Sequence, residues 1–138
     1  MGLPQSSEAR RYYRAGKQRL DDAQFLLEGK RTTGAVYLAG YTVECMLKAL
    51  LLANVSARRR NELLGEFRGS RAHNIEWLGA LYRRHVRGVI PRNITRHLSR
   101  VASWSTDLRY ASGLVKAREA DEFMDSVVTV AAWADRGM

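Results

Sequence analysis

One long apolar segment in the first half of the chain limits the folds that the whole chain can adopt. Residues 33–54 are apolar on nearly every side of a helical projection, and Glu44 and Lys48 are the only charged residues in the run from 35 to 55. A helix that is apolar all round is buried on all sides. Two charges in the run argue against a membrane span. We therefore expect this segment to be the central helix of an all-α bundle, without membrane contact.

Apolar spacing and capping residues predict further helices. Apolar residues recur at three- and four-residue steps after Ser6 and Ser7, either of which can cap a helix, and Gly29 can end it. Gly88 suits the end of a later helix, and Pro91 suits the first turn of the next. The expected helices span about residues 7–28, 33–54, 72–87, 91–104 and 114–135. The connector over 56–69 can form a short helix of its own. Short connections predict an antiparallel bundle of about five helices in one domain over residues 1–138.

Positive charge is concentrated in one part of the chain. Lys and Arg number 23 against 14 Asp and Glu, which gives a net charge of +9, and arginine greatly outnumbers lysine. No acidic residue occurs between Glu76 and Asp107. That stretch contains six arginines and three aromatic rings: Arg83, Arg84, Arg87, Arg92, Arg96, Arg100, Trp77, Tyr82 and Trp104. Arginine binds phosphate through a planar pair of donors, so the stretch suits a polyanion. A solvated basic face that serves only solubility remains the alternative.

Cysteine and histidine are scarce. Cys45 is the single cysteine, which excludes an internal disulfide and a cysteine-built zinc site, and the three histidines lack cysteine neighbours. We expect no metal and no cofactor. The first eleven residues are polar and do not resemble a signal peptide, so we expect a cytoplasmic protein.

The two charges of the central helix need partners. Glu44 precedes Lys48 by four residues, the favourable order for a salt bridge on one helix. Glu44 alternatively holds an arginine from elsewhere, with Arg109 as the candidate. A buried carboxylate without a cation would be costly.

Four segments resemble the HEPN domain family, named for higher eukaryotes and prokaryotes nucleotide-binding. The run AVYLAGYTVECMLKAL at residues 35–50 resembles that family's second helix, and residues 12–29 resemble its first. HNIEWL at 73–78 is similar to its His-Asp-Leu-x-x-Leu element, with Asn74 in place of Asp. LRY at 108–110 resembles its Arg-Tyr element. Their order and spacing cover nearly the whole chain.

The resemblance implies a ligand class and partners. HEPN domains are all-α bundles and usually homodimers. Many are metal-independent endoribonucleases in toxin–antitoxin, defence or CRISPR-associated systems, with the signature Arg-x(4–6)-His. Others lack activity and bind a nucleotide, or pair with a small nucleotidyltransferase that acts as antitoxin. The resemblance therefore implies a homodimer with RNA or a nucleotide as ligand, and an antitoxin or nucleotidyltransferase as a further partner.

Two segments match the signature. Arg92 and His97 are separated by four residues, and Asn93 follows the arginine as the family prefers. Arg68 and His73 have the same spacing but lie in the connector. We favour the first pair. Neither match is followed by the x-Tyr that some of the toxins carry, which weakens the case for a nucleotidyltransferase antitoxin.

Helix geometry restricts the favoured pair. Five residues at 100° each place Arg92 and His97 roughly 140° apart on a straight helix. Asn93, His97 and Arg100 share a face instead. Arg92 therefore joins His97 only by folding back or across a dimer, as the family's composite cleft implies. In that arrangement His97 would exchange a proton. Arg92, with Arg96 or Arg100, would stabilise phosphate charge. If the pair does not meet, His97 is a helix-flank residue and the arginines are solvated.

Overall fold

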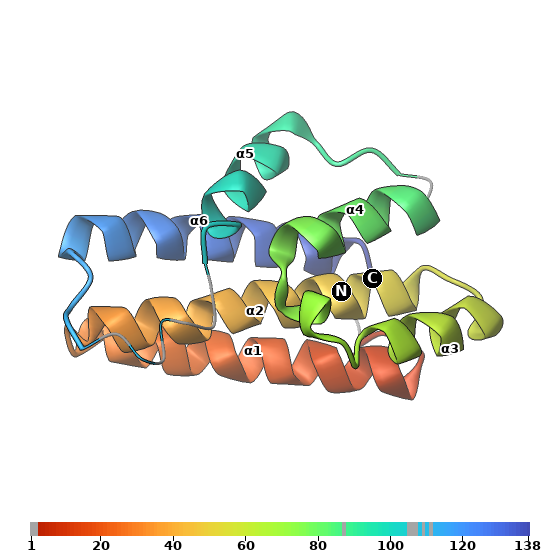
Figure 1. The fold of residues 1–138 in the computed structure, drawn as a ribbon, viewed down its shortest axis with the longest axis horizontal. Helices are drawn as coiled ribbons and strands as arrows, with labels where there is room; N and C mark the ends of the chain where they lie inside the picture. The colour runs from red at the N-terminus through yellow and green to blue at the C-terminus, as the bar shows by residue number, and fades with distance from the viewer. Residues whose placement is uncertain (1–2, 87, 105–107, 109, 111) are drawn as a thin grey trace.

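The computed structural model describes residues 3–86, 88–104, 108, 110 and 112–138, and over these ranges the chain forms helices and no strand (Figure 1). Their bounds are α1 Ser7–Glu28, α2 Thr32–Ala53, α3 Ala57–Glu66, the 3-10 helix η1 Ser70–His73, α4 Ile75–His85, α5 Arg92–Val101 and α6 Ala117–Arg136. The prediction of an all-α bundle is confirmed.

The three long helices do not all alternate in direction. α1 and α2 form an antiparallel hairpin, whereas α6 runs parallel to α2 (Figure 1). Thr32 Oγ1 donates to the carbonyl of Val115 near the start of both helices. At the other end, Asn54 Nδ2 donates to the carbonyl of Gly137 over 3.1 Å. The parallel pair arises because α3, η1, α4 and α5 carry the chain back along the bundle before α6 begins.

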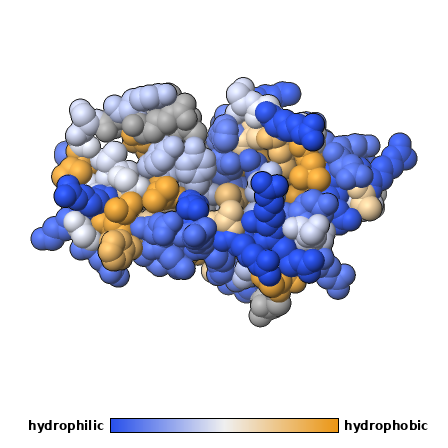
Figure 2. All heavy atoms as spheres, turned by 90° about the horizontal axis from the view of Figure 1, so that it is seen from below, coloured by the Kyte–Doolittle hydropathy of each residue, from blue (hydrophilic) through white to orange (hydrophobic). Residues whose placement is uncertain are grey.

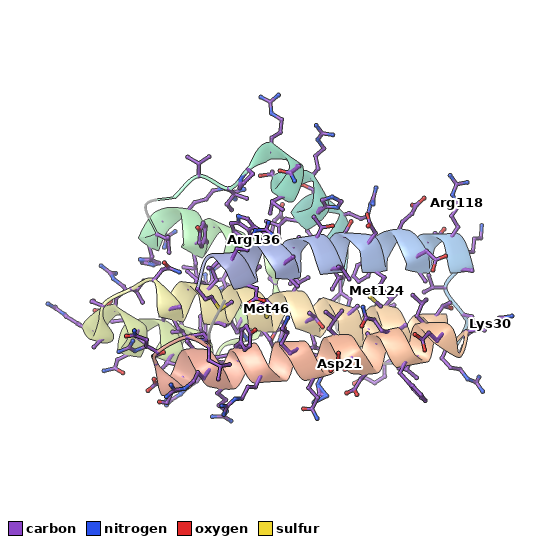
Figure 3. The ribbon with its side chains drawn as sticks, turned by 180° about the vertical axis from the view of Figure 1, so that it is seen from behind. Asp21, Lys30, Met46, Arg118, Met124 and Arg136 are labelled. Carbon is purple, nitrogen blue, oxygen red and sulfur yellow. The ribbon has the colours of Figure 1, made fainter. Side chains whose placement is uncertain are left out.

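α2 occupies the centre of the bundle, as its sequence predicts. Most of its residues are buried against α1 and α6, including Met46 with no exposed surface. Met124 of α6 is also buried, and both methionines lie between the long helices in Figure 3. α2 is long and apolar enough to cross a membrane, but 78% of its most apolar window is buried inside the protein. Its apolar surface is therefore already covered by protein.

The turn between α1 and α2 has a backbone conformation that its sequence does not predict. α1 ends as expected at Gly29, but the following Lys30 adopts the left-handed φ of 61°. The Arg31 N–H bonds to the Leu26 carbonyl at 2.8 Å, and the Lys30 N–H bonds to the Leu27 carbonyl at 3.0 Å. These bonds form a Schellman motif, in which a residue with positive φ satisfies the last carbonyls of the helix. A lysine occupies the position that favours glycine.

The connector after α2 forms a helix of its own. Ser56 caps α3 by accepting the N–H of Arg59 at 3.2 Å. Leu63 is fully buried and anchors the helix to the core. The expected connector over 56–69 is thus mostly helical.

α4 is shorter than the helix expected over 72–87. It begins at Ile75 because Asn74 has an extended backbone and its side chain accepts the N–H of Trp77. The preceding turn is the separate 3-10 helix η1. Arg87, the last residue expected in this helix, lies outside the described residues.

The last two helices also differ from the expected bounds. α5 ends at Val101 rather than near 104. α6 begins three residues later than expected because Val115 is held outside the helix: its N–H bonds to Thr33 Oγ1 at 3.0 Å. A contact more than 80 residues away in sequence thus sets where α6 begins.

Figure 2 shows one face that is mostly hydrophilic, with apolar residues in separate groups. Phe25 and Leu114 are among the exposed large apolar side chains, with 77% and 67% of their surface exposed.

Candidate functional site

α5 presents a basic outer face, as its spacing predicts. Ile94, Leu98 and Val101 are buried and attach the helix to the bundle. Arg92, Asn93, Arg96 and Arg100 are exposed. The alternation follows the 100° turn per residue of an α-helix. The favoured candidate residues are therefore on the protein surface and accessible to a ligand.

His97 and Arg100 meet at one buried hydroxyl on α6. The Nδ1 of His97 lies 2.8 Å from the Oγ of Ser126, and an Nη1 of Arg100 donates to the same oxygen at 3.2 Å. Ser126 has no exposed surface, whereas His97 is half-buried. Arg100 Nη1 also lies 3.5 Å from the carbonyl of Glu122. The structure thus places a histidine beside an arginine three residues further along α5.

The Ser126 hydroxyl can pair with His97 in more than one way. A guanidinium can only donate, so the Ser126 oxygen accepts from Arg100. The same hydroxyl can either donate to His97 Nδ1 or accept from it. Nε2, the ring nitrogen that does not contact Ser126, is the one that would exchange a proton with a ligand. Ser126 was not among the residues predicted from the sequence. The sequence feature that could have identified it is a serine within the apolar face of α6, between Phe123 and Val130.

Within one chain the structure does not bring Arg92 to His97. Arg92 is the first residue of α5, is exposed and has no hydrogen bond or ion pair to another described residue. Asn93 and Arg96 are exposed as well. The expected roughly 140° separation on the helix therefore stands in the single chain.

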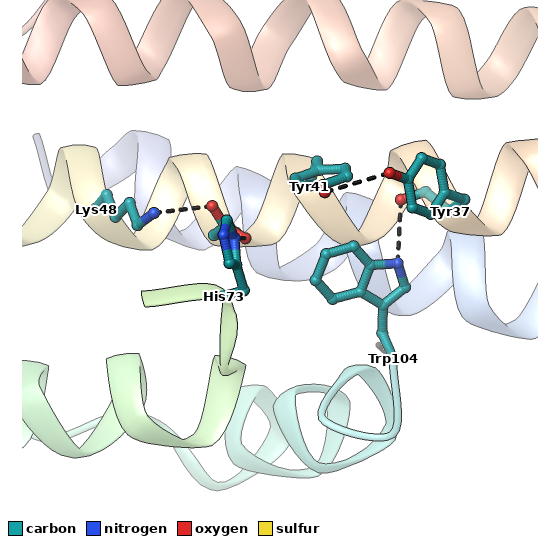
Figure 4. A network of polar contacts seen from close by, with 6 residues as sticks. Tyr37, Tyr41, Lys48, His73 and Trp104 are labelled. Atoms are coloured by element: carbon teal, nitrogen blue, oxygen red, sulfur yellow. Dashed lines mark hydrogen bonds and ion pairs between the residues drawn. The ribbon is translucent and has the colours of Figure 1, made fainter. Parts of the chain in front are cut away.

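The alternative histidine, His73, contacts a buried carboxylate. Its Nδ1 lies 3.0 Å from Oε1 of Glu44, and Lys48 Nζ donates to the other oxygen, Oε2, at 2.8 Å (Figure 4). Arg68, its partner in the sequence motif, is exposed at the C-terminal end of α3. The salt bridge expected between Glu44 and Lys48 is thus present. A histidine fills the second partner position for which an arginine was considered, and Arg109 lies outside the described residues.

This network joins α2 to the layer above it. Glu44 and Lys48 are each only 4% exposed. The Lys48 ammonium lies 5.5 Å from the centroid of the Tyr12 ring and 5.4 Å from that of Phe67, so it contacts two aromatic rings. His73 closes the carboxylate from the solvent side. The geometry indicates that the network holds η1 and α3 against α2.

Aromatic side chains of the acid-free stretch pack within the protein. Trp104 is 6% exposed, and its Nε1 donates to the carbonyl of Tyr37 at 3.0 Å (Figure 4). Tyr82 is 8% exposed and contacts the ring of Trp133. Trp77 is half-buried beneath Arg71, whose guanidinium lies 5.5 Å from the ring centroid. These three rings therefore pack against other parts of the protein.

No group of three or more His, Cys, Asp or Glu side chains that could hold a metal ion occurs among the residues described. The charged groups of the α5 face are arginines, which bind anions directly.

The all-α fold agrees with the family whose model matches the sequence. The family model of the HEPN domain matches residues 9–136, and the chain therefore belongs to the HEPN domain family. Neither the curated proteins nor the solved structures contain a match to the chain. Membership of this family associates the protein with a nucleotide- or RNA-related function in general.

Proposed function

We propose that this protein is a metal-independent endoribonuclease of the toxin–antitoxin or defence type, with His97 as its acid–base group. The observation that supports the proposal is the meeting of His97 and Arg100 at the Ser126 hydroxyl. An imidazole and a guanidinium lie side by side on an exposed basic helix, which is what an acid–base group and a phosphate-binding group would require.

RNA carries its own nucleophile, so this chemistry needs few groups. The 2′-oxygen attacks the adjacent phosphorus, and the bond to the 5′-oxygen breaks. His97 in its imidazolium form donates the Nε2 proton to the departing 5′-oxygen. Arg100 stabilises the charge on the phosphate oxygens. Water takes the proton that the 2′-hydroxyl releases, so each site needs one His97. The products are a 2′,3′-cyclic phosphate and a 5′-hydroxyl.

The proposed homodimer would bring together Arg92 and His97, which lie apart within one chain. Arg92 and His97 lie on different flanks of α5, and two copies of α5 facing each other across a twofold axis would pair the Arg92 flank of one chain with the His97 flank of its partner. Each composite site would then contain an arginine from both chains. Asn93 and Arg96, exposed beside them, would bind the flanking RNA backbone.

Cleavage of single-stranded RNA in EDTA tests the proposal directly. We expect His97→Ala to abolish cleavage and His85→Ala, a half-buried histidine of α4, to retain it. Equal cleavage by wild type and His97→Ala would refute the assignment. An antitoxin or nucleotidyltransferase partner is the expected inhibitor of the activity.

Mixing two inactive variants tests the composite site. If each site uses Arg92 of one chain and His97 of the other, Arg92→Ala and His97→Ala are each inactive alone. After subunit exchange, half of the dimers are mixed and hold one intact site of two, so about a quarter of the wild-type activity returns. No recovery in a verified mixed dimer would show that both residues act within one chain.

The separation of Arg92 from His97 within one chain favours a second candidate, a non-catalytic HEPN module. Such a module binds a nucleotide or a partner nucleotidyltransferase without turnover. It predicts RNA binding that His97→Ala leaves unchanged and no cleavage by the wild type.

A further inference from the structure

A hollow lies on the other side of α5 from His97. Residues of α4 and α5 line a cleft between the two helices: Glu76, Gly79, Arg83, Thr95, Ser99 and Ala102. The α4 residues recur at steps of three and four, as do the α5 residues, so one face of each helix borders the cleft. Gly79, Ser99 and Ala102 are small. Two helix faces with small side chains leave space between them for a flat group.

Two opposite charges, those of Glu76 and Arg83, flank this space. Glu76 stands in the first turn of α4 and Arg83 in the last. The helix dipole favours both positions, so neither charge needs an ion pair to be stable there. Neither side chain forms an ion pair or hydrogen bond with another residue in the part of the chain that the structure describes. Their hydrogen-bonding groups are available to a ligand.

The Arg83 side chain reaches back over the cleft floor. One of its Nη atoms, Nη1, lies 3.7 Å from the position that a Cβ on Gly79 would take. Glu76 lies three residues before Gly79, on the opposite side from Arg83. A planar ligand resting on Gly79 would therefore meet a carboxylate at one edge and a guanidinium at another.

Guanine is the base whose edges match this pair. An ionised carboxylate has only acceptors, and guanine presents two adjacent donors, N1–H and the N2 amino group. Guanine also presents the acceptors O6 and N7, which arginine binds in a two-pronged manner. Adenine, cytosine and uracil each place an acceptor beside their donor on the Watson–Crick edge. A carboxylate therefore discriminates against them.

The arginines of α5 connect the cleft to the proposed cleavage face. At 100° per residue, Arg92 lies on the cleft side of the helix, Arg96 on its outer crest and Arg100 beside His97 on the α6 side. A single strand crossing α5 would pass over all three cations. Sequence-specific RNA recognition uses bases splayed out of a single strand in this way.

We propose that the cleft between α4 and α5 binds a guanine of single-stranded RNA, with Glu76 accepting from its Watson–Crick edge and Arg83 donating to O6 and N7. The inference rests on the proposed function in one respect, that RNA is the ligand. It adds the base that the protein selects and the two residues that select it.

The test measures binding of uncleavable RNA, so it does not depend on turnover. The probes are 2′-O-methyl oligouridines that carry one central guanosine, inosine or adenosine, and fluorescence anisotropy gives their affinities. We expect the guanosine probe to bind about tenfold more tightly than the adenosine probe. Inosine, which lacks the N2 amino group, should fall between them.

Three variants test whether the cleft residues produce the preference for guanosine. Glu76→Gln should remove most of the preference for guanosine and leave the adenosine affinity nearly unchanged. Glu119→Gln neutralises an exposed carboxylate in the first turn of α6 and should keep the preference. Gly79→Leu fills the cleft, and we expect it to fold as wild type by circular dichroism but to lose the preference.

Two results would overturn the inference: equal affinity of wild type for guanosine and adenosine, or an undiminished preference in Glu76→Gln. The proposed function fails separately. A wild type that prefers guanosine but never cleaves RNA would refute the nuclease and support the cleft. Cleavage that depends on His97 without any base preference would support the nuclease and refute the guanine-binding cleft.

Discussion

The indole of Trp104 lies directly against the backbone of Gly40, in the space where any other residue would carry its side chain. A Cβ at position 40 would come within 2.1 Å of the indole Nε1 and Cε2 atoms. The ring is held there by its hydrogen bond to the Tyr37 carbonyl. This contact fixes the segment that follows α5 onto the central helix.

Gly40→Ala should therefore destabilise the protein, although alanine is the better helix former. The indole must move, and overpacking of this kind costs about 1–3 kcal/mol of unfolding free energy. Urea unfolding followed by tryptophan fluorescence measures the change. Gly65→Ala in α3, where a Cβ meets nothing within 4 Å, is the control and should stabilise by about 0.5–1 kcal/mol. A gain of stability in both variants would contradict the packing described.

Removal of the Glu44 carboxylate should be among the most damaging single changes. Glu44→Ala leaves the Lys48 ammonium buried without its anion, and breaking a buried pair costs about 3–5 kcal/mol. Replacing both partners, as Glu44→Leu with Lys48→Met, should cost clearly less. Equilibrium unfolding in urea gives both values. Glu62→Ala removes an exposed carboxylate 3.3 Å from Arg59 and should cost at most about 1 kcal/mol.

Ser126→Ala tests whether the buried hydroxyl positions His97. Without it the ring loses the partner at Nδ1, and a displaced catalytic group costs about ten- to hundredfold in rate. We expect kcat for RNA cleavage to fall by that factor while RNA affinity stays close to that of wild type. Ser103→Ala, which removes an exposed hydroxyl bonded to the Arg100 carbonyl, should change neither. An unchanged kcat in Ser126→Ala would mean that the hydroxyl only fills space.

The contribution of Arg96 to RNA binding should be measurable from the dependence of RNA affinity on salt concentration. If Arg96 contacts one phosphate of a single strand, Arg96→Ala should reduce the slope of log K against log salt by about 0.7. Binding titrations between 50 and 200 mM salt, about the range over which such affinities fall steeply, provide that slope. Arg118→Ala removes an exposed arginine at the start of α6, which points away from the bundle in Figure 3. The slope for Arg118→Ala should match that of wild type. An equal reduction of the slope in Arg96→Ala and Arg118→Ala would indicate that net charge alone attracts the RNA.

Cys45 should react slowly with thiol reagents in the folded protein. Burial raises the pKa of its thiol to about 11, and the nearby Glu44 carboxylate adds to the shift. The thiolate is the reactive form, so at pH 8 only about one thiol in a thousand is reactive. The labelling rate should rise with pH towards 11 and should increase sharply in urea at constant pH. Labelling at pH 7 as fast in the folded as in the unfolded protein would contradict this environment.

Local signals explain why the long helices could be predicted and why several ends could not. Ser6 caps α1 by accepting the N–H of Ala9, a bond between residues three apart that the sequence displays. The start of α6 instead depends on Val115 bonding to Thr33, which no local pattern reveals. The parallel arrangement of α2 and α6 has the same origin, because it follows from the path of the intervening chain.

The candidate site divides in a similar way. Helical periodicity placed His97 and Arg100 on one flank of α5 and Arg92 on another, since that arithmetic needs only the helix itself. The sequence also indicated that Glu44 requires a cation. It could not supply Ser126 or His73, because each lies 29 residues from its partner and reaches it through the tertiary fold.

The parallel pairing of α2 and α6 has a consequence for how the chain folds. The bonds that join the two helices at either end each link residues 83 positions apart, whereas α1 reaches α2 through a tight turn. Closing a long loop costs more entropy than closing a short one, so contacts of high sequence separation form late. The hairpin of α1 and α2 therefore forms first, and one apolar side of α2 stays uncovered until α6 packs against it. In a chain made from its N-terminus, that side stays open until the 20 residues of α6 have been synthesised. The interval before α6 docks is when aggregation is most probable, and a chaperone would bind α2 then.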